Sequence, residues 1–168
     1  MNKVEEVLVA LRRVIRATDL HSRHLAKTTG LTAPQILSLQ TIRNKGDVTI
    51  GELANAMSLS QATVTTILDR LEKRDLVYRE RSTEDKRKVY ACLTDKALEV
   101  LQSAPVPLQD QFTRQFGDLK EWEQTMIISS LQRVAQMMDA QHIDASPVLD
   151  VGVLDRQDTT DLDKNAIR

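Results

Sequence analysis

The hydrophobic pattern changes its period between residues 61 and 94, and this change restricts the folds available to the chain. The segment QATVTTILDRLEKR, residues 61–74, places apolar side chains on one face at the spacing of about 3.6 residues that is typical of a helix. The segments LVYRER and KVYACL, residues 76–81 and 88–93, instead alternate and are rich in strand-forming residue types. The polar stretch STEDKR between them predicts a hairpin loop. A helix that runs directly into a β-hairpin is therefore expected.

Two further helices are predicted before this one, from capping patterns. TAPQ at Thr32 and TIGE at Thr49 place a hydroxyl three residues before an amide or acid that can reach back to it. They predict helices over residues 33–43 and 50–57, and the turn SLS joins the latter to the helix at 61–74. Two short helices joined by such a turn form a helix-turn-helix, whose second helix can enter the major groove of DNA. With the hairpin attached, the pattern predicts a winged helix-turn-helix.

Helices are also expected on both sides of this core. At the N-terminus, apolar residues recur at steps of three and four from Val4 to about Leu25, and Gly30 ends the predicted helix. No capping pattern is needed to recognise this helix.

On the C-terminal side, a helical region is expected from Asp95, with Thr94 as its cap. Pro105 and Pro107 must break or kink it, because proline lacks an N–H and clashes with the preceding turn. Helix is expected to resume over residues 108–116. DLKE at Asp118 then predicts the start of a last helix over residues 121–140.

The size and composition of the chain exclude several classes of protein. At 168 residues and 19.0 kDa, the chain can form one domain, or a small domain plus an interface. It has five glycines and no phosphate-binding loop, HExxH, CxxC or nucleophile elbow, so we expect no enzyme and no cofactor. No apolar run approaches the ~18 residues of a membrane span, and the N-terminus is unlike a secretory signal. With a single cysteine, Cys92, no intramolecular disulfide can form, and we expect a cytoplasmic protein that does not contact membranes.

The charge is unevenly distributed along the chain. The formal net charge is only −1, but the Asp-rich residues 141–168 carry −3, which leaves +2 on residues 1–140. Within that part, Lys86, Arg87 and Lys88 form a run of three cations at the predicted hairpin tip. A basic cluster beside a helix-turn-helix favours an extended polyanion as the partner.

The stretch SLSQATVTTILDRLEKRDLVYRERSTEDKRKVYACLT resembles the MarR family of winged-helix transcription regulators. It has that family's order of turn, recognition helix, strand, wing with Asp-x-Arg at its tip (Asp85 and Arg87) and closing Leu-Thr (Leu93 and Thr94). The resemblance covers about residues 5–140. More weakly, MMDAQHIDASPVLDVGVLDR, residues 137–156, resembles the C-terminal region of regulators found with ectoine and compatible-solute genes.

The resemblance implies a homodimer that binds double-stranded DNA at a pseudo-palindromic promoter site, most simply as a repressor. It also implies a response to a small-molecule effector or to an osmotic or stress signal, although no residue identifies an effector. The apolar stripes on residues 4–25 and 126–138 lie outside the winged core and need a partner that buries them, which independently favours a dimer.

Four parts of the chain are expected on this basis. These are an N-terminal dimerisation helix (1–30), a winged helix-turn-helix DNA-binding domain (31–94), C-terminal dimerisation helices (95–145) and an acidic flexible tail (146–168). PVLDVGVL within that tail could dock on another part of the chain.

The DNA-binding residues are predicted on the recognition helix and on the wing. On the helix, side chains that can reach base edges or phosphate are expected to bind DNA: Ser60, Gln61, Thr63, Thr65, Thr66 and Arg70. On the wing, Arg87 is expected in a minor groove with Asp85 orienting it, and the remaining cations are expected to face phosphates: Arg79, Arg81, Lys86 and Lys88. The alternative is a solvated hairpin whose charges pair with one another. Arg70 in particular could pair within its own helix.

The sequence departs from the family pattern at several positions. Asp75 stands where the family often has a glycine in a left-handed conformation, which Asp tolerates better than most residues. Thr66 stands where a basic residue is common, so base specificity cannot be transferred from a relative. The interruption at Pro105 and Pro107 is unusual and leaves the dimer geometry open.

Other functions remain as alternatives. A winged fold can bind a protein partner instead of DNA, and a zinc-responsive regulator is a third reading. His21 and His24 are spaced i and i+3 on the first helix, which can chelate zinc, but two ligands do not make a site. Cys92 could be a redox switch, yet its place in the returning strand favours a small buried or half-buried residue.

Overall fold

The computed structural model describes residues 2–143 and 145–150, and the chain divides into two compact units. The first contains residues 2–105 together with 147–150, and the second is Val106–Ser146. Helices dominate both, and a small antiparallel sheet lies in the first. The predicted fold class, mostly α with a small β wing, is confirmed. No helix in the described part of the chain is both long enough and apolar enough to cross a membrane.

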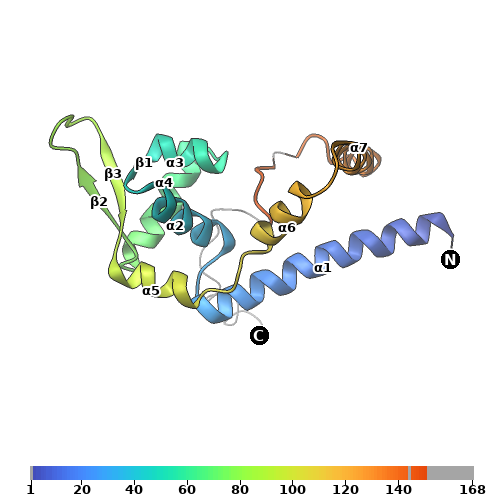
Figure 1. Ribbon diagram of the computed structural model, residues 1–168, viewed down its shortest axis with the longest axis horizontal. Helices are drawn as coiled ribbons and strands as arrows, with labels where there is room; N and C mark the ends of the chain where they lie inside the picture. The colour runs from blue at the N-terminus through green and yellow to red at the C-terminus, as the bar shows by residue number, and fades with distance from the viewer. Residues whose placement is uncertain (1, 144, 151–168) are drawn as a thin grey trace, which may run out of the picture. The chain divides into compact units, whose positions relative to one another are not determined.

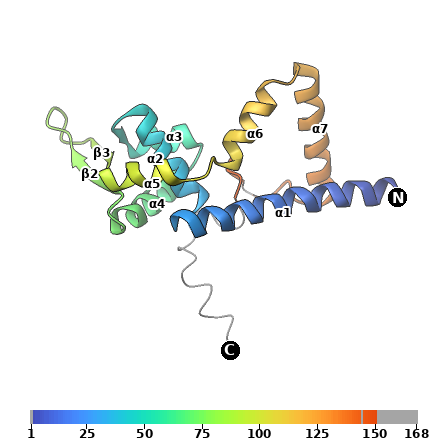
Figure 2. The ribbon, with the colours of Figure 1, turned by 60° about the horizontal axis from the view of Figure 1, so that its bottom comes forward.

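The first unit begins with a long helix, α1 (Lys3–Thr29). Its start is fixed by a capping box that its apolar stripe did not reveal: the Glu5 N–H donates to Asn2 Oδ1 (3.0 Å), and the Asn2 N–H donates to Glu5 Oε2 (3.1 Å). Gly30 ends the helix as predicted, in a left-handed conformation with φ of 70°. The N-terminal half of α1 extends beyond the other elements of this unit, so its apolar side chains are exposed (Figure 2).

Three shorter helices build the core of this unit: α2 (Ala33–Lys45), α3 (Ile50–Met57) and α4 (Gln61–Lys73). Their starts agree with the capping patterns. The Thr32 N–H donates to Gln35 Oε1 (2.9 Å), and Thr49 and Glu52 form a reciprocal capping box. The three helices bury apolar side chains that meet in one core, and α4 buries the face that its spacing predicted. The buried residues include Ile36, Leu39, Ile42, Leu53, Val64, Ile67, Leu68 and Leu71.

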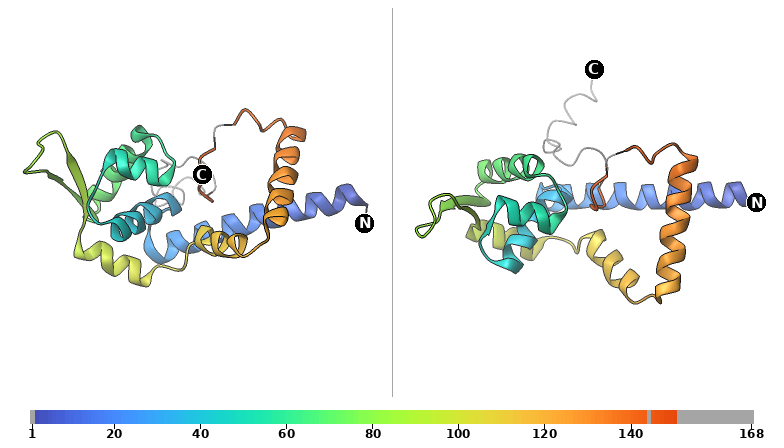
Figure 3. Two further views of the ribbon diagram at one scale, coloured as in Figure 1. Left: turned by 45° about the horizontal axis from the view of Figure 1, so that its top comes forward. Right: turned by 90° about the horizontal axis from the view of Figure 1, so that it is seen from above.

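The sheet has three strands in the order β1-β3-β2, and the alternating segments supply two of them. β2 (Val77–Arg81) pairs antiparallel with β3 (Val89–Leu93), with Val77 opposite Leu93 and Arg81 opposite Val89. β1 (Val48–Thr49), which the sequence pattern did not predict, pairs with β3 through Ala91 and Tyr90. The β2–β3 hairpin projects beyond α2, α3 and α4, and forms the wing (Figures 1 and 3).

The helical region after the wing is interrupted where the prolines predicted. α5 (Asp95–Ser103) begins at the Thr94 cap, whose hydroxyl accepts the Ala97 N–H (3.2 Å), and helix resumes only at α6 (Leu108–Gly117). The predicted cap for the last helix is wrong. The Asp118 N–H donates to the Arg114 carbonyl (3.2 Å), so Asp118 still closes α6, and α7 (Glu121–Met137) begins after Lys120, whose N–H donates to Glu123 (2.9 Å).

The described part of the predicted tail makes contacts within the first unit. Val148 is half-buried and packs against the core, and the Ser22 hydroxyl donates to Asp150 Oδ1 (2.8 Å). The segment that starts at Pro147 is thus held against α1 at Ser22. The remainder of the predicted tail, residues 151–168, lies outside the described residues.

Candidate nucleic-acid interface

The recognition helix α4 is held in place by its buried face. α3 ends at Ser58 in a left-handed conformation (φ of 53°), Leu59 enters the core, and Ser60 begins α4. The side chain of Ser60 accepts the Thr63 N–H (3.1 Å) and thus satisfies one of the unpaired donors at the helix start. Because Val64 and Leu68 are fully buried, the opposite face of α4 must point outward.

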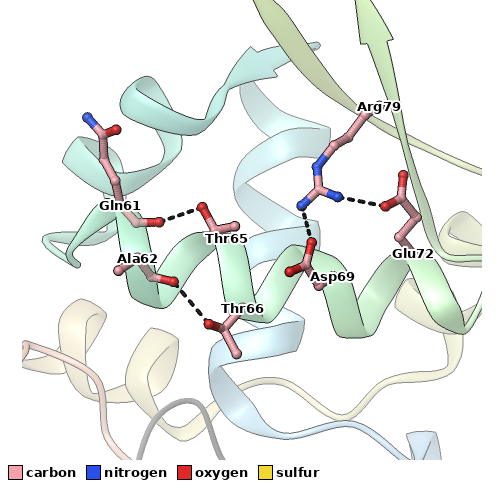
Figure 4. A network of polar contacts seen from close by, with 7 residues as sticks. All are labelled: Gln61, Ala62, Thr65, Thr66, Asp69, Glu72 and Arg79. Carbon is pink, nitrogen blue, oxygen red and sulfur yellow. Dashed lines mark hydrogen bonds and ion pairs between the residues drawn. The ribbon is translucent and has the colours of Figure 1, made fainter.

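The outward face of α4 carries the predicted base contacts. Gln61 is exposed, while Thr63, Thr65, Thr66 and Arg70 are half-buried. The hydroxyls of Thr65 and Thr66 donate to the carbonyls of Gln61 (2.8 Å) and Ala62 (3.1 Å) in the preceding turn (Figure 4). Their donor hydrogens are used within the helix, which leaves oxygen lone pairs and methyl groups to face a ligand. Such groups can accept from a base amino group or contact the methyl group of thymine.

Ser60 has a structural role as well as its predicted contact with phosphate. Its hydroxyl lies 2.8 Å from that of Thr63, besides capping the helix. The two hydroxyls share one hydrogen bond, so one of their two hydrogens remains for an external acceptor. The helix N-terminus at which they stand also favours an anion.

The tip of the wing is ordered by hydrogen bonds of its own side chains. The Ser82 hydroxyl accepts the N–H groups of Glu84 (3.2 Å) and Asp85 (3.1 Å), and the Asp85 carbonyl accepts the Lys88 N–H (2.8 Å). The Asp85 carboxylate accepts the backbone N–H of Arg87 (3.1 Å). Asp85 thus fixes the backbone at Arg87, and the guanidinium is left to point outward.

Four cations of the wing are exposed and form no ion pair within 4 Å among the described residues: Arg81, Lys86, Arg87 and Lys88. The hairpin that carries them is anchored by buried Val77 and Ala91, and by the pairing of β1 with β3. The wing therefore presents a positive surface from a rigid base, as an interface with phosphates requires.

Arg79 differs from the other cations of the wing. It stands on β2, but its guanidinium points to α4 and pairs with both Asp69 and Glu72, at 2.6 Å each (Figure 4). The sequence pattern predicts Arg79 among the phosphate contacts and does not connect it to these two carboxylates. The spacing of these two carboxylates, i and i+3 on one helix face, was the sequence signal that they could share one cation. Only the packing of β2 beside α4 brings Arg79 next to them.

A second arginine, which the sequence pattern does not single out, joins α4 to the end of α1. Arg74 follows α4, and its Nη1 donates to the carbonyl of Gly30, while its own carbonyl accepts Lys96 Nζ (2.8 Å). The next residue, Asp75, adopts the predicted left-handed conformation with φ of 58°. Its carbonyl accepts the Thr94 hydroxyl (2.8 Å). The C-terminal end of the recognition helix is thus fixed to both α1 and the start of α5.

Neither the cysteine nor the histidines form a reactive or metal-binding centre among the described residues. Cys92 is buried on β3, opposite Tyr78, and desolvation by burial, together with a hydrogen bond to Asp47, raises the pKa of its thiol to about 11. The thiol is therefore protonated at neutral pH, and a protonated thiol is a much weaker nucleophile than a thiolate. Burial, and next the neighbouring His24, lower the pKa of His21. In the described ranges, no three His, Cys, Asp or Glu side chains are grouped so that they could hold a metal ion.

This chain is similar to known proteins in both sequence and fold. Residues 31–89 match the model of the MarR family. The chain is 27% identical over 138 residues to YsmB, an HTH-type transcriptional regulator of Bacillus subtilis, covering 82% of this chain and 94% of YsmB. It is 36% identical over 97 residues to the HTH-type transcriptional regulator MgrA of Staphylococcus aureus, covering 57% of this chain and 66% of MgrA.

A solved structure extends this similarity to three dimensions. It is that of BpsR from Bordetella bronchiseptica, whose DNA binding is regulated by 6-hydroxynicotinic acid. The TM-score is 0.51 at 27% identity, over 77% of this chain and 98% of BpsR.

Proposed function

Because this chain belongs to the MarR family of winged helix-turn-helix transcriptional regulators, which are not enzymes, we propose that it represses transcription by occupying a promoter as a homodimer. The observation that carries the proposal is the joint surface of α4 and the wing. The outward side chains of α4 offer groups that can read bases, and Arg81 with the three tip cations offers charges for phosphates. Both stand on one anchored unit, so they can engage adjacent grooves together.

The homodimer is supported by apolar side chains that the single chain leaves exposed. On α1, Val14 and Ile15 are each 63% exposed, and on α7 Met126 and Leu131 are 55% and 56% exposed. Helices with such faces need a partner that covers them. We assign residues 1–30 and 95–145 to dimerisation, residues 31–94 to DNA binding, and residues 146–168 to an acidic tail.

A two-fold dimer determines the form of the operator. Two copies of α4 related by a two-fold axis read the same bases in opposite directions, so the site is a pseudo-palindrome. Its half-sites lie about one helical turn apart, ~34 Å from centre to centre. The protein acts in the cytoplasm, where promoter DNA is accessible to it.

An effector is the natural means of regulating such a dimer. The resemblance to BpsR, whose DNA binding responds to a small molecule, supports a small-molecule effector here, or an osmotic or stress signal acting in its place. A ligand that binds one dimer conformation more tightly shifts the population toward it and changes the spacing of the two recognition helices. No residue of the chain defines the chemistry of that ligand.

The test is a titration of the full chain onto labelled DNA, followed by fluorescence anisotropy. The duplex upstream of the protein's own gene is compared with a scrambled duplex of the same composition, each over a series of salt concentrations. A sequence-specific regulator binds the upstream duplex at least ~10³-fold more tightly, with an affinity that falls steeply with salt. Weak and equal binding to both duplexes, without a salt dependence, would contradict the proposal and favour a protein partner for the winged fold.

The zinc-responsive alternative is separated from this proposal in the same assay. Adding zinc and then a chelator changes the affinity of a metal-responsive regulator, whereas the affinity stays unchanged if His21 and His24 bind no zinc.

A further inference from the structure

The ion pairs of Arg79 are the strongest feature of the interface that the proposed function does not use. The guanidinium bridges two carboxylates: Nη2 lies 2.6 Å from Asp69 Oδ1, and Nη1 lies 2.6 Å from Glu72 Oε2. The Arg79 side chain is 24% exposed, while those of Asp69 and Glu72 are 51% and 41% exposed. The cation is thus more covered than either of its partners, and its charge is directed to the helix.

The two carboxylates stand where DNA is expected to approach. Asp69 follows Thr65 by four residues and Thr66 by three, and Glu72 follows Asp69 by three, so all lie on neighbouring positions of one helix face. The same face begins with Gln61 and the predicted base contacts. Two unpaired negative charges there would repel the phosphates that border the groove.

Arg79 is suited to cancel these charges and to hold the two elements together. A planar guanidinium can donate to two carboxylates at once in a fixed geometry, whereas a lysine acts as a single point charge. Its strand is anchored by buried Val77, so the guanidinium also links the wing to α4. Figure 4 shows this link, with Arg79 directed from the strand toward the helix.

We propose that Arg79 is a positioning residue for DNA binding, which neutralises Asp69 and Glu72 and fixes the wing to the recognition helix, and that it does not bind phosphate. The inference rests on the proposed function, because it concerns how the same surface meets DNA. It also divides the wing cations into two kinds. Arg81, two residues further along the same strand, is exposed and has no carboxylate partner among the described residues, so it remains a phosphate contact.

The test asks whether removing the carboxylates compensates for removing the arginine. Binding to the upstream duplex is measured over a salt series for the wild type, for Arg79→Gln, and for the triple variant Arg79→Gln/Asp69→Asn/Glu72→Gln. We expect Arg79→Gln to weaken binding by about tenfold or more, because two carboxylates then face phosphates. The triple variant removes the repulsion but not the loss of the link between the wing and α4, so it is expected to recover most of the affinity, to within about threefold of the wild type, with the same dependence on salt.

Arg81→Gln is the matched control, since it removes the same charge from the same strand. It should reduce the slope of log affinity against log salt by about 0.9 per protomer, and Asp69→Asn/Glu72→Gln should not restore its slope. A melting curve of each variant verifies that it is folded.

Each outcome decides a different claim. If the triple variant binds as weakly as Arg79→Gln, and its slope of log affinity against log salt is reduced by about 0.9 per protomer, then Arg79 binds phosphate. The inference is then overturned, while the proposed function stands. If the wild type shows no salt-dependent preference for the upstream duplex, the proposed function fails, and this inference fails with it.

Discussion

Replacing Gly30 by alanine should destabilise the protein through two separate effects. Gly30 has φ of 70°, and an alanine in this left-handed conformation costs about 1–2 kcal/mol. A Cβ atom at this position would also lie 2.8 Å from Nη2 of Arg74, whose guanidinium donates to the Gly30 carbonyl. Hydrogen bonds from charged donors contribute about 1.5–3 kcal/mol when buried, and we take about 1 kcal/mol for this half-exposed one.

The expected loss is therefore about 2–3 kcal/mol in the free energy of unfolding. For a chain of this length, that corresponds to a decrease of about 5–10 °C in the melting temperature. Urea unfolding followed by circular dichroism measures it. The protein concentration must be held constant, because the stability of a chain that forms the proposed dimer depends on it.

A double-mutant cycle separates the two effects. In an Arg74→Gln background the collision and the hydrogen bond are both absent, so Gly30→Ala should cost only about 1–2 kcal/mol. Gly117→Ala is the control, since a Cβ there meets nothing within 4 Å and its φ is ordinary; it should be neutral or slightly stabilising. A loss below about 0.5 kcal/mol at Gly30 would refute the conformational argument. An equal loss in both backgrounds would refute the role assigned to Arg74.

Four further predictions concern the wing, the turn after α4, the cysteine and the dimer. Arg87→Ala should weaken DNA binding and lower the salt slope by about 0.9 per protomer in the anisotropy assay, and an unchanged affinity at physiological salt would remove its assigned role. Asp75→Gly should raise the free energy of unfolding by about 0.5–1 kcal/mol, because φ of 58° suits glycine better; a decrease in urea unfolding would contradict this. Cys92, with its pKa raised to about 11, should have roughly one thiol in a thousand ionised at pH 8, so a thiol reagent should label it rapidly only in denaturant. Ile15→Asp should convert the proposed dimer to monomers in sedimentation experiments, and a dimer that persists would exclude this face of α1 from the interface.

The sequence was sufficient for most local structure, because the signals involved are local. The capping patterns at Thr49 and Thr94, the prolines at 105 and 107, and the alternating strands each act within a few residues, and the structure has the expected element at each. The wrong prediction of a helix cap at Asp118 also comes from the local character of these patterns. Its pattern resembles a cap, but the residue is held by the preceding helix instead. The two-residue strand β1 is too short to show a period and exists only through its pairing with β3.

The sequence by itself thus determined the order of the helices and the two wing strands, the winged helix-turn-helix and the kinds of side chain on its outward surface. Tertiary structure alone decided which of those side chains are committed to partners within the chain. Arg79 and Arg81 are equivalent in an alternating strand, yet only Arg79 meets two carboxylates on α4. The contact of Arg74 with Gly30 joins residues 44 positions apart. Such pairs depend on how a strand or helix end packs on another element, and periodicity along one segment carries no information about that packing.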